Sequence, residues 1–571
     1  MNASSASSDY HVLSKAAQVM DSYPVNLTRA VGIASMLFVL AFCRLSPSSK
    51  STKAWTAFYL TVFFLYTLQP LAFQATTASI KLYASQHPIK TTLTLVAIAA
   101  PLKYIQQKLR YARLNAIKMK FGYTNDPTTW QDMTVEQAQE IESNMAEWEF
   151  PRLWQFGWIS DFFRTSTDPA VSRVIGASGH FINEDKKIEH QRMQATIHLM
   201  TGFVAYKVKS RNHSLVVARI NEHHHRYGIK INSDDVLYLM IHFGLAPVPW
   251  INRFGYRKME DFEVHAIWTL WRENACRMGV KYIPKTLEQA MEWRKNFETT
   301  FRWREDANEV MAMAMLNQVL YPVPGPLKGF VAQVFASIVE WDIVYYCQLE
   351  KLRPSPVIRS IAYDFFRLCA FLIREFGLPR LSPYQRSPQE SGPDGRMTFG
   401  HTPYDTMPWW QERTFWNLWG PRALFGRLLG LPRPSSEYQS EGVPFESMGA
   451  PHPYPRAQAA IEKKVRENAA ILEDAPFGFR PAVGFQANRL LPPVDGPAYG
   501  SEMNTFPPDT PTTPASPLRF SREYERRGGV YSNLGDVETP ADVLSGTDKD
   551  LKEKVLAAVP HTPRANGATV G

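Results

Sequence analysis

The sequence predicts an all-α domain behind one or more N-terminal membrane segments, and three observations indicate this fold class. Between about residues 125 and 385 the apolar positions recur with the period of an α-helix, whereas the strict alternation typical of β-strands is scarce. A strongly apolar, uncharged stretch precedes this region. After it, residues 386–571 are rich in Pro, Ser, Gly and charge, which predicts a mostly disordered tail.

The N-terminal part divides into a polar start, residues 1–29, and a membrane region, residues 30–105. Residues 54–75 (AWTAFYLTVFFLYTLQPLAFQA) carry no charge and are long enough to cross a hydrocarbon core of about 30 Å, so they are the strongest candidate for a span. Residues 30–43 could form a short span, an interfacial helix or a helix packed against the main span, and residues 91–105 are a third candidate. Because polar residues come first and a full-length span follows, we expect a retained anchor and not a cleaved signal peptide.

The charge pattern favours a lipid bilayer, and not nucleic acid, as the acidic partner. The formal net charge of +9 comes from Lys and Arg spread along the 571 residues, without one dense basic tract interleaved with aromatics. Six basic residues follow the apolar run of residues 91–102 and predict that the next domain is cytoplasmic: Lys103, Lys108, Arg110, Arg113, Lys118 and Lys120. The few, widely spaced cysteines form neither a disulfide framework nor a zinc pattern, as expected in a reducing compartment.

Local signals support helices throughout the central region. Capping-box patterns at residues 134–137 (TVEQ) and 286–289 (TLEQ) each precede an amphipathic run. Residues 236–243 and 363–373 are apolar but short or interrupted by charge, so we expect buried helices that supply the core. Within the tail, the aromatic residues 407–431 suit either an interfacial helix or a strap packed over the domain.

Two neighbouring helices carry the strongest candidates for chemistry. Arg192 and Thr196 lie four residues apart and therefore share one helix face. A second helix follows with three consecutive histidines, and these point in directions about 100° apart, so they cannot all serve one site. Measured from the apolar face centred on Ile220, His224 lies roughly 40° away, His223 roughly 60° and His225 roughly 140°. His225 should face solvent, and His224 is the inward candidate.

The residues alone leave the roles of these side chains open. A buried neutral imidazole at His224 could ligate a metal, or it could form an ordinary hydrogen bond inside the core. Arg192 and Thr196 could likewise be a surface arginine and a helix-packing threonine. Repeated histidine clusters of a di-iron membrane enzyme, a Gly-x-Ser-x-Gly, a phosphate-binding glycine loop and a Cys-x-x-Cys-His run do not occur. The sequence thus gives no support to hydrolase, nucleotide-binding or di-iron functions.

A series of motifs in this region resembles the family of the rubber oxygenase (latex-clearing protein) and of the ER-bound oxygenase of the mycophenolic acid pathway, and it is closer to the ER-bound branch. The motifs occur in the same order: Arg219-Ile-Asn-x-x-His224-x-x-Tyr227, residues 231–238 (INSDDVLY), residues 249–257 (PWINRFGYR), Glu263 with Ala266, Trp271-Arg272, residues 278–280 (MGV), residues 283–286 (IPKT) and residues 377–380 (GLPR).

The resemblance implies an all-helical haem-b oxygenase domain over residues 115–385, held at the endoplasmic reticulum membrane with its catalytic part in the cytoplasm. It assigns the axial haem-iron ligand to His224, and places Arg192 and Thr196 beside the haem. Ala195 stands where the rubber-cleaving branch has a lysine. The implied reaction uses O2 to cleave a carbon–carbon double bond of an apolar, prenyl-like small molecule. The alternative from another class is a non-catalytic, membrane-anchored scaffold that uses its long tail to bind partners.

Overall fold

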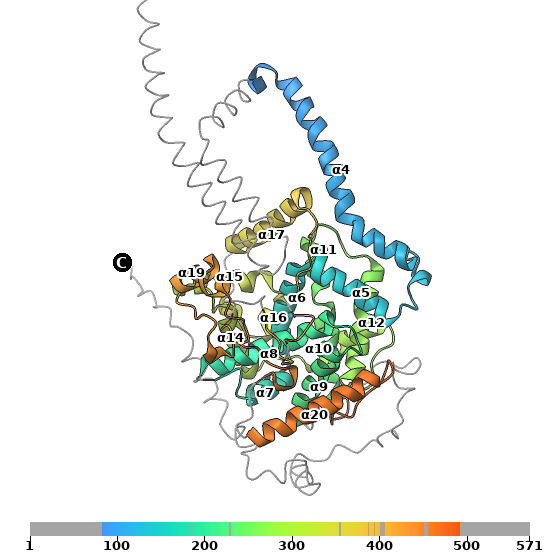
Figure 1. Ribbon diagram of the computed structural model, residues 1–571, viewed down its shortest axis with the longest axis vertical. Helices are drawn as coiled ribbons and strands as arrows, with labels where there is room; N and C mark the ends of the chain where they lie inside the picture. Colours follow the sequence, from blue (N-terminus) through green and yellow to red (C-terminus); the bar gives the residue numbers. More distant parts are fainter. Residues whose placement is uncertain are drawn as a thin grey trace, which may run out of the picture. The chain divides into compact units, whose positions relative to one another are not determined.

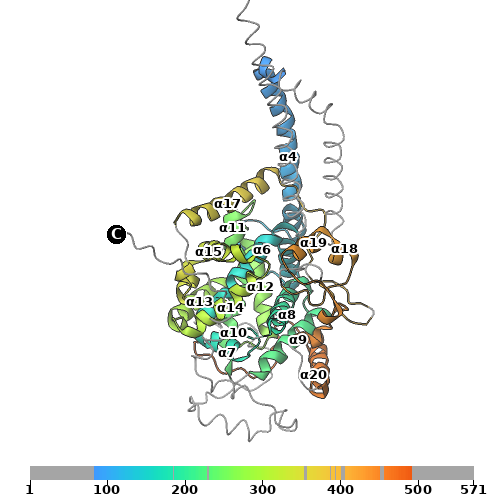
Figure 2. The same cartoon turned by 90° about the vertical axis from the view of Figure 1, so that its left-hand side faces the viewer.

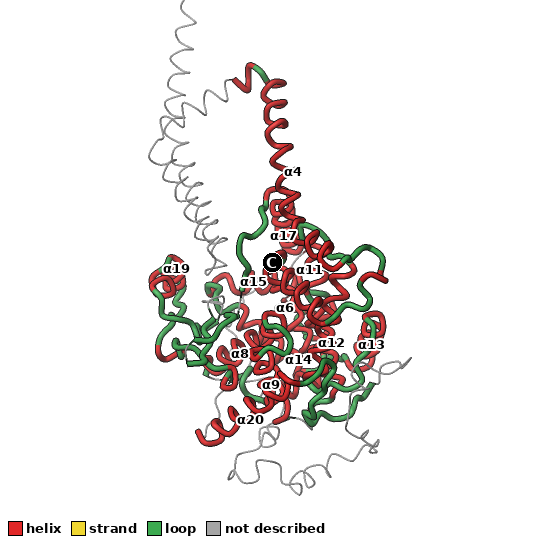
Figure 3. The backbone as a smooth tube through the Cα atoms, turned by 45° about the vertical axis from the view of Figure 1, so that its right-hand side comes forward, coloured by secondary structure: helices red, strands yellow, loops and turns green. Residues whose placement is uncertain are grey.

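The computed structural model describes residues 83–490, except for residues 184, 228–229, 353–355, 386, 393, 400–405 and 450–454. All regular elements in this part of the chain are helices, and its only extended pairings are isolated bridges between Asn232 and Gln486 and between Met397 and Val443. Figure 3 accordingly shows helices and loops. The predicted all-α class is confirmed.

Seventeen α-helices and several short helical turns make up the described chain. The helices are α4 (Pro88–Phe121), α5 (Val135–Ser143), α6 (Pro151–Arg164), α7 (Pro169–Ala177), α8 (Lys186–Ala205), α9 (Arg211–Arg226), α10 (Ser233–Leu245), α11 (Pro247–Phe254), α12 (Asp261–Arg277), α13 (Leu287–Phe301), α14 (Asp306–Val319), α15 (Lys328–Ile338), α16 (Trp341–Tyr346), α17 (Pro356–Phe376), α18 (Phe415–Trp419), α19 (Pro421–Leu428) and α20 (Pro455–Asp474). Two of the turns matter below, the π-helical turn η2 (Asn144–Glu149) and the 3-10 turn η8 (Phe445–Ser447).

The core lies in the larger of two compact units, which α4 enters at Lys103. Its centre consists of α5, α9, α10 and α12, and α12 packs on both α5 and α10 (Figure 1). Trp268 and Trp271 on α12 are almost completely buried there. A second apolar cluster joins α14, α15 and α16 to Phe163 at the end of α6. Large aromatic side chains give such a centre much of its hydrophobic stabilisation.

The predicted capping boxes are present and fix the starts of two helices. At α5 the Thr134 hydroxyl accepts the Gln137 amide at 3.3 Å, and the Gln137 side chain accepts the Thr134 amide at 2.9 Å. Thr286 and Gln289 exchange the same pair of bonds at the start of α13. Each box satisfies amide groups that the first helical turn leaves without a partner.

A glycine sets the close approach of α8 and α9, the two helices that carry the candidate residues. A Cβ atom built at Gly202 on α8 would lie 2.7 Å from a methyl carbon of Val216 on α9. Val216 and Val217 are fully buried and Ile220 nearly so, as the predicted apolar face of α9 requires. Any larger residue at position 202 would push the two helices apart.

The predicted boundary at residue 385 is wrong, because the chain continues to build the same core up to residue 490. Helix α20 lies along α9 (Figures 1 and 2). Its buried side chains recur every three or four residues and are Ala457, Ile461, Val465, Ala469 and Leu472. Trp410, Phe445 and Met448 are also buried in the main cluster. The high Pro, Ser and Gly content of the tail as a whole masked this apolar helical stripe. Residues 491–571 lie outside the described part.

The aromatic segment 407–431 packs partly on the core. Trp409, Trp410 and Ala423 are buried, as a packed strap requires. Large apolar side chains on α18 and α19 are exposed at the same time, namely Phe415, Trp416, Trp419, Phe425 and Leu428. One edge of the segment therefore belongs to the core and the other lies on the surface.

The expectation that residues 363–373 form a buried core helix is wrong. These residues belong to α17, and Phe365 and Leu368 are each 54% exposed. Only Ala362 on this helix is fully buried. A charged, amphipathic helix can bury one narrow face and still expose a second apolar face when no other element covers it.

The two stronger membrane candidates, residues 30–43 and 54–75, lie outside the described residues. The third, residues 91–105, forms part of α4, which also contains Pro101. None of the helices in the described part of the chain has both the length and the hydropathy needed to cross a bilayer. The prediction that residues 91–105 could span the membrane is therefore not supported.

Candidate functional site

Arg192 and Thr196 meet on one face of α8, as their spacing predicts. The Arg192 Nη1 donates a hydrogen bond to the Thr196 hydroxyl. That hydroxyl in turn donates to the Arg192 carbonyl at 3.0 Å, a bond between residues one helical turn apart. The hydroxyl proton of Thr196 is therefore bonded to a backbone carbonyl. The N–H groups that can still bind a ligand here belong to the Arg192 guanidinium.

The Arg192 guanidinium lies in an environment that offers little compensation for its charge. Burial lowers its pKa, and Tyr227 is the group that opposes this effect. Its guanidinium carbon lies 5.1 Å from the centre of the Phe181 ring. No ion pair joins it to a carboxylate among the described residues. A largely buried cation of this kind fits an anionic ligand that would supply the missing negative charge.

His224 lies on α9 next to this arginine and is neutral. Burial, and secondarily the positive charge of Arg192, lowers the pKa of His224 to about 4. Its Nδ1 atom is buried and has no hydrogen-bond partner among the described residues. The ring centre lies 5.8 Å from that of Phe485, which belongs to the C-terminal part of the core. An unprotonated, unpartnered imidazole nitrogen is the state that a metal or haem iron requires of its ligand.

The neighbouring histidines are engaged elsewhere. His223 donates its Nε2–H to the Met448 carbonyl at 3.3 Å, and the same carbonyl accepts Arg219 Nε at 2.8 Å. His225 is exposed, as predicted, and donates Nδ1–H to the Val483 carbonyl at 2.9 Å. Both acceptors come from the region after residue 385. Of the three consecutive histidines, His224 is the one whose buried ring nitrogen has no hydrogen-bond partner among the described residues, and it stays the candidate ligand.

The loop that holds His223 depends on a glycine. Gly449 has a φ of +119°, and a Cβ atom there would lie 2.9 Å from His223 Nε2. The Gly449 carbonyl also accepts the side-chain amide of Gln191 on α8 at 3.2 Å. The loop after η8 thus connects α8 with α9 across the candidate site, and it was not anticipated from the sequence.

A bare metal site is not indicated at this place. Burial lowers the pKa of His180 to about 4, and Arg192 adds to this effect, so a second neutral imidazole besides that of His224 lies near the arginine. Even so, the described residues contain no group of three His, Cys, Asp or Glu side chains that could hold a metal ion. A single protein ligand suits a cofactor that brings its own equatorial donors.

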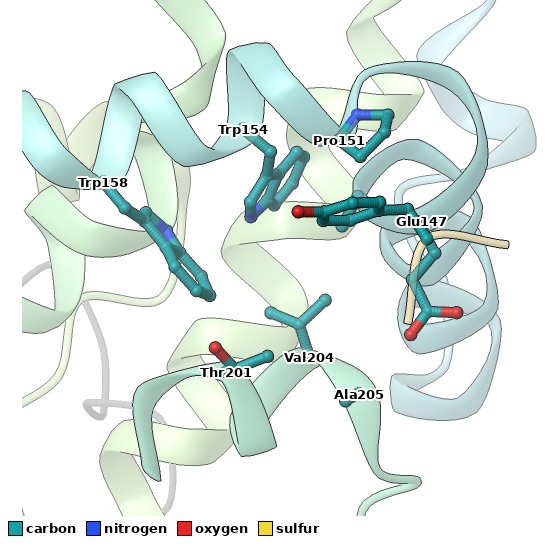
Figure 4. A pocket seen from close by; sticks show the side chains of 9 residues that line it. Glu147, Pro151, Trp154, Trp158, Thr201, Val204 and Ala205 are labelled. Atoms are coloured by element: carbon teal, nitrogen blue, oxygen red, sulfur yellow. The ribbon is translucent and has the colours of Figure 1, made fainter. Parts of the chain in front are cut away.

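A separate hollow lies between α6, η2 and α8 and contains none of these candidate residues (Figure 4). Its volume is about 330 Å3, which includes space open to solvent at the mouth. Trp154 and Trp158 face Thr201 and Val204 across it. Glu147 also lines it, and burial raises the pKa of Glu147 to about 7. The Trp154 Nε1 is buried without a hydrogen-bond partner among the described residues.

No family model matches the chain, but curated proteins do. Over 376 residues the chain is 27% identical to the ER-bound oxygenase mpaB' of Penicillium brevicompactum, and the match covers 63% of this chain and 88% of that protein. Over 247 residues it is 29% identical to the ER-bound oxygenase mpaB of Penicillium roqueforti, covering 40% of this chain and 81% of that protein. The chain is a homologue of these ER-bound oxygenases.

This similarity to ER-bound oxygenases agrees with the resemblance found in the motifs. Two motif residues of that resemblance have structural roles here. The Asn221 amide donates to the Arg277 carbonyl at 2.8 Å, and the fully buried Arg219 donates from Nε to the Met448 carbonyl at 2.8 Å. Both fix α9 relative to α12 and to the loop after η8, so that His224 is held in place.

Proposed function

We propose that the protein is an ER-membrane-bound, haem-b-dependent oxygenase that uses O2 to cleave a carbon–carbon double bond of an apolar, prenyl-like molecule. The homology to proteins named ER-bound oxygenases supports the oxidoreductase class and the membrane association. The observation that carries the haem assignment is the neutral His224 with its unpartnered Nδ1, next to a cation that lacks a carboxylate among the described residues.

The side chains around α8 and α9 fit a haem in two respects. His224 would offer the haem iron a neutral nitrogen, since burial keeps the imidazole unprotonated at neutral pH. Arg192 offers N–H donors and a positive charge, which suit a haem propionate because a guanidinium binds carboxylates with matched geometry. When bound, the haem would supply the chemistry by which one O2 and one alkene become two carbonyl products.

Arg192 is the better hydrogen-bond donor of the predicted pair. The Thr196 hydroxyl already donates to the Arg192 carbonyl and accepts from the guanidinium. Thr196 would therefore act chiefly by holding the Arg192 side chain in position, and it could donate to a ligand only after leaving the backbone carbonyl. This assigns Thr196 a positioning role and Arg192 the direct contact with an anionic group.

The test is a visible absorption spectrum of the full chain, expressed with haem supplied and recorded in the oxidised and dithionite-reduced states. We expect a Soret band that shifts on reduction in the wild type. His224→Ala should lose or shift this band, whereas His225→Ala, an exposed neighbour on the same helix, should keep it. The melting temperature of each variant shows whether the fold is retained.

Two outcomes would contradict the proposal. A folded wild-type chain without a Soret band would exclude haem and favour the non-catalytic scaffold. Equal spectra for His224→Ala and the wild type would show that another residue ligates the iron. His180 would then be replaced next, because it too is neutral and near Arg192.

A further inference from the structure

Helix α17 carries an uncovered apolar stripe along its whole length. Its exposed large side chains are spaced by three or four residues, so they lie on one helix face. They are Val357 (65% exposed), Ile361 (61%), Phe365 (54%), Leu368 (54%), Leu372 (46%) and Phe376 (72%). A soluble surface rarely exposes a continuous apolar patch of this kind, and such patches mark sites of interaction with proteins or membranes.

The opposite face of α17 packs against the domain, which fixes the stripe outward. Phe366 contacts three aromatic rings, those of Phe156 on α6 and of Trp250 and Phe254 on α11, with centroid distances of 5.6, 5.9 and 5.3 Å. Ala362 is buried on the same side. Turning the stripe inward would therefore expose Phe366 to solvent.

The end of α17 is fastened to the helix that leads from the membrane region. Gln106 on α4 donates to the carbonyls of Arg374 and Gly377 at 3.2 and 2.7 Å. Arg110 donates to the Gly377 carbonyl at 2.6 Å, and Lys103 pairs with Glu375 at 2.6 Å. These bonds satisfy carbonyls that the last helical turn leaves without a partner. They also join α17 to the helix that follows the predicted span at residues 54–75.

The composition of α17 suits the surface of a bilayer better than its interior. Charged side chains interrupt it, and within the described residues no helix can cross a membrane. Its three arginines, Arg359, Arg367 and Arg374, outnumber its two acidic residues, Asp364 and Glu375. An amphipathic helix with an apolar face and a basic excess lies in the interface plane, where its apolar face replaces water with acyl chains and its cations meet anionic headgroups.

We propose that α17 is a second membrane contact of this protein, lying flat in the cytoplasmic leaflet with the Val357–Phe376 stripe among the acyl chains. This inference goes beyond the proposed oxygenase activity and does not depend on haem. If the predicted span at residues 54–75 tethers the chain, as the proposed function implies, even a weak interfacial contact is favoured by the high effective concentration of the membrane surface. The consequence is a domain held in one orientation on the bilayer.

The experiment places a nitroxide label at position 368 of the full chain, reconstituted in vesicles of phosphatidylcholine and phosphatidylserine. Cys43 and Cys369 are first replaced by Ser, and Cys276 and Cys347 remain because both are fully buried. Leu368→Cys is compared with Ile471→Cys on α20, where the native side chain is 56% exposed, against 54% for Leu368. Collisions of the label with oxygen and with a water-soluble nickel complex report its depth.

We expect the label at 368 to lie about 5–10 Å below the headgroup boundary, and the label at 471 to remain in water. Adding Phe365→Glu and Leu372→Glu should return the label at 368 to water while the chain stays on the vesicles. A label at 368 as accessible to nickel as that at 471 would overturn the proposal. A label at 368 that is shielded from both oxygen and the nickel complex would also overturn the proposal. The stripe would then be covered by protein, either by the predicted span or by a second copy of the chain.

Discussion

At the residue scale, burial decides which ionisable groups can take part in chemistry. His224 is kept neutral mainly by desolvation, and its neighbours His223 and His225 differ from it through the carbonyls that they contact. Burial also shifts the pKa of Glu147, but upward, because the charged form of a carboxyl group is the deprotonated one. Its pKa of about 7 arises because burial removes water from its carboxyl group. The carboxyl group of Glu147 therefore gains or loses its proton near neutral pH.

We expect Glu147→Gln to stabilise the protein more at pH 8 than at pH 5. The pKa of Glu147 is about 7 in the folded state and near its ordinary value of 4.5 in the unfolded chain. The wild type therefore loses stability as pH rises through this window, since the folded state must give up a proton that it binds more tightly. The glutamine variant avoids this loss, and the difference in free energy of unfolding should reach about 1–3 kcal/mol.

Denaturant titrations at several pH values measure this difference. Glu467→Gln, at an exposed position of α20, is the matched control and should leave the pH dependence of the wild type unchanged. A Glu147→Gln variant with the same pH dependence as the wild type would show that this carboxyl is solvated in the folded protein.

At the scale of elements, the chain after residue 385 supplies partners that the helices of the central region lack. The clearest case is Arg489, which pairs with Asp235 at the start of α10 and lies 3.6 Å from carboxylate oxygens of both Asp168 and Asp234. Asp168 and Asp234 are fully buried. Without the arginine, three carboxyl groups would face one another with little water. The acidic pair in the motif 231–238 is therefore structural.

Replacing Arg489 with Met should lower the free energy of unfolding by about 3–5 kcal/mol at pH 7, the usual cost of removing one partner from a buried ion pair. The loss should be smaller at pH 5, because burial and the neighbouring carboxylates already raise the pKa of Asp235 to about 7 and protonation relieves their repulsion. Chemical denaturation at both pH values tests this.

Arg396→Met is the matched control for Arg489→Met. Arg396 also pairs with two carboxylates, those of Asp394 and Glu441, but all three side chains are more than a third exposed. Its loss should change stability by no more than about 1 kcal/mol. Equal effects of the two substitutions would mean that burial does not strengthen the Arg489 cluster.

At the scale of the whole molecule, the folded domain extends about a hundred residues further than its motifs suggest. Helix α20, the loop after η8 and Phe485 all pack on α9, the helix that carries His224. The candidate site is thus closed by a part of the chain that none of the family motifs includes. We expect the site to be unstable in any fragment that ends with those motifs.

A chain ending at residue 385 should therefore fail to fold cooperatively, whereas one ending at residue 490 should melt like the full chain. The shorter chain lacks the buried side chains of Trp410, Phe445, Met448 and Val465, and each large apolar side chain removed from a core costs about 2–5 kcal/mol. That total exceeds the stability of a typical domain. Thermal unfolding followed by circular dichroism distinguishes the two, and a cooperative transition for both would contradict the role of the tail.

The sequence by itself determined the features that arise from local periodicity and local hydrogen bonds. These are the all-α class, the capping boxes at Thr134 and Thr286, the buried face of α9 and the contact between Arg192 and Thr196. Each depends on residues within one or two helical turns of each other, so the spacing along the chain is sufficient to predict it.

Only the tertiary structure decided which faces are covered and by what. It showed that Met448 and Val483 engage His223 and His225, that Arg489 pairs with the acidic motif, and that α17 keeps an apolar stripe exposed. An amphipathic pattern states that a face is apolar, but whether that face meets the core or the surface depends on partners hundreds of residues away, whose approach no local pattern encodes.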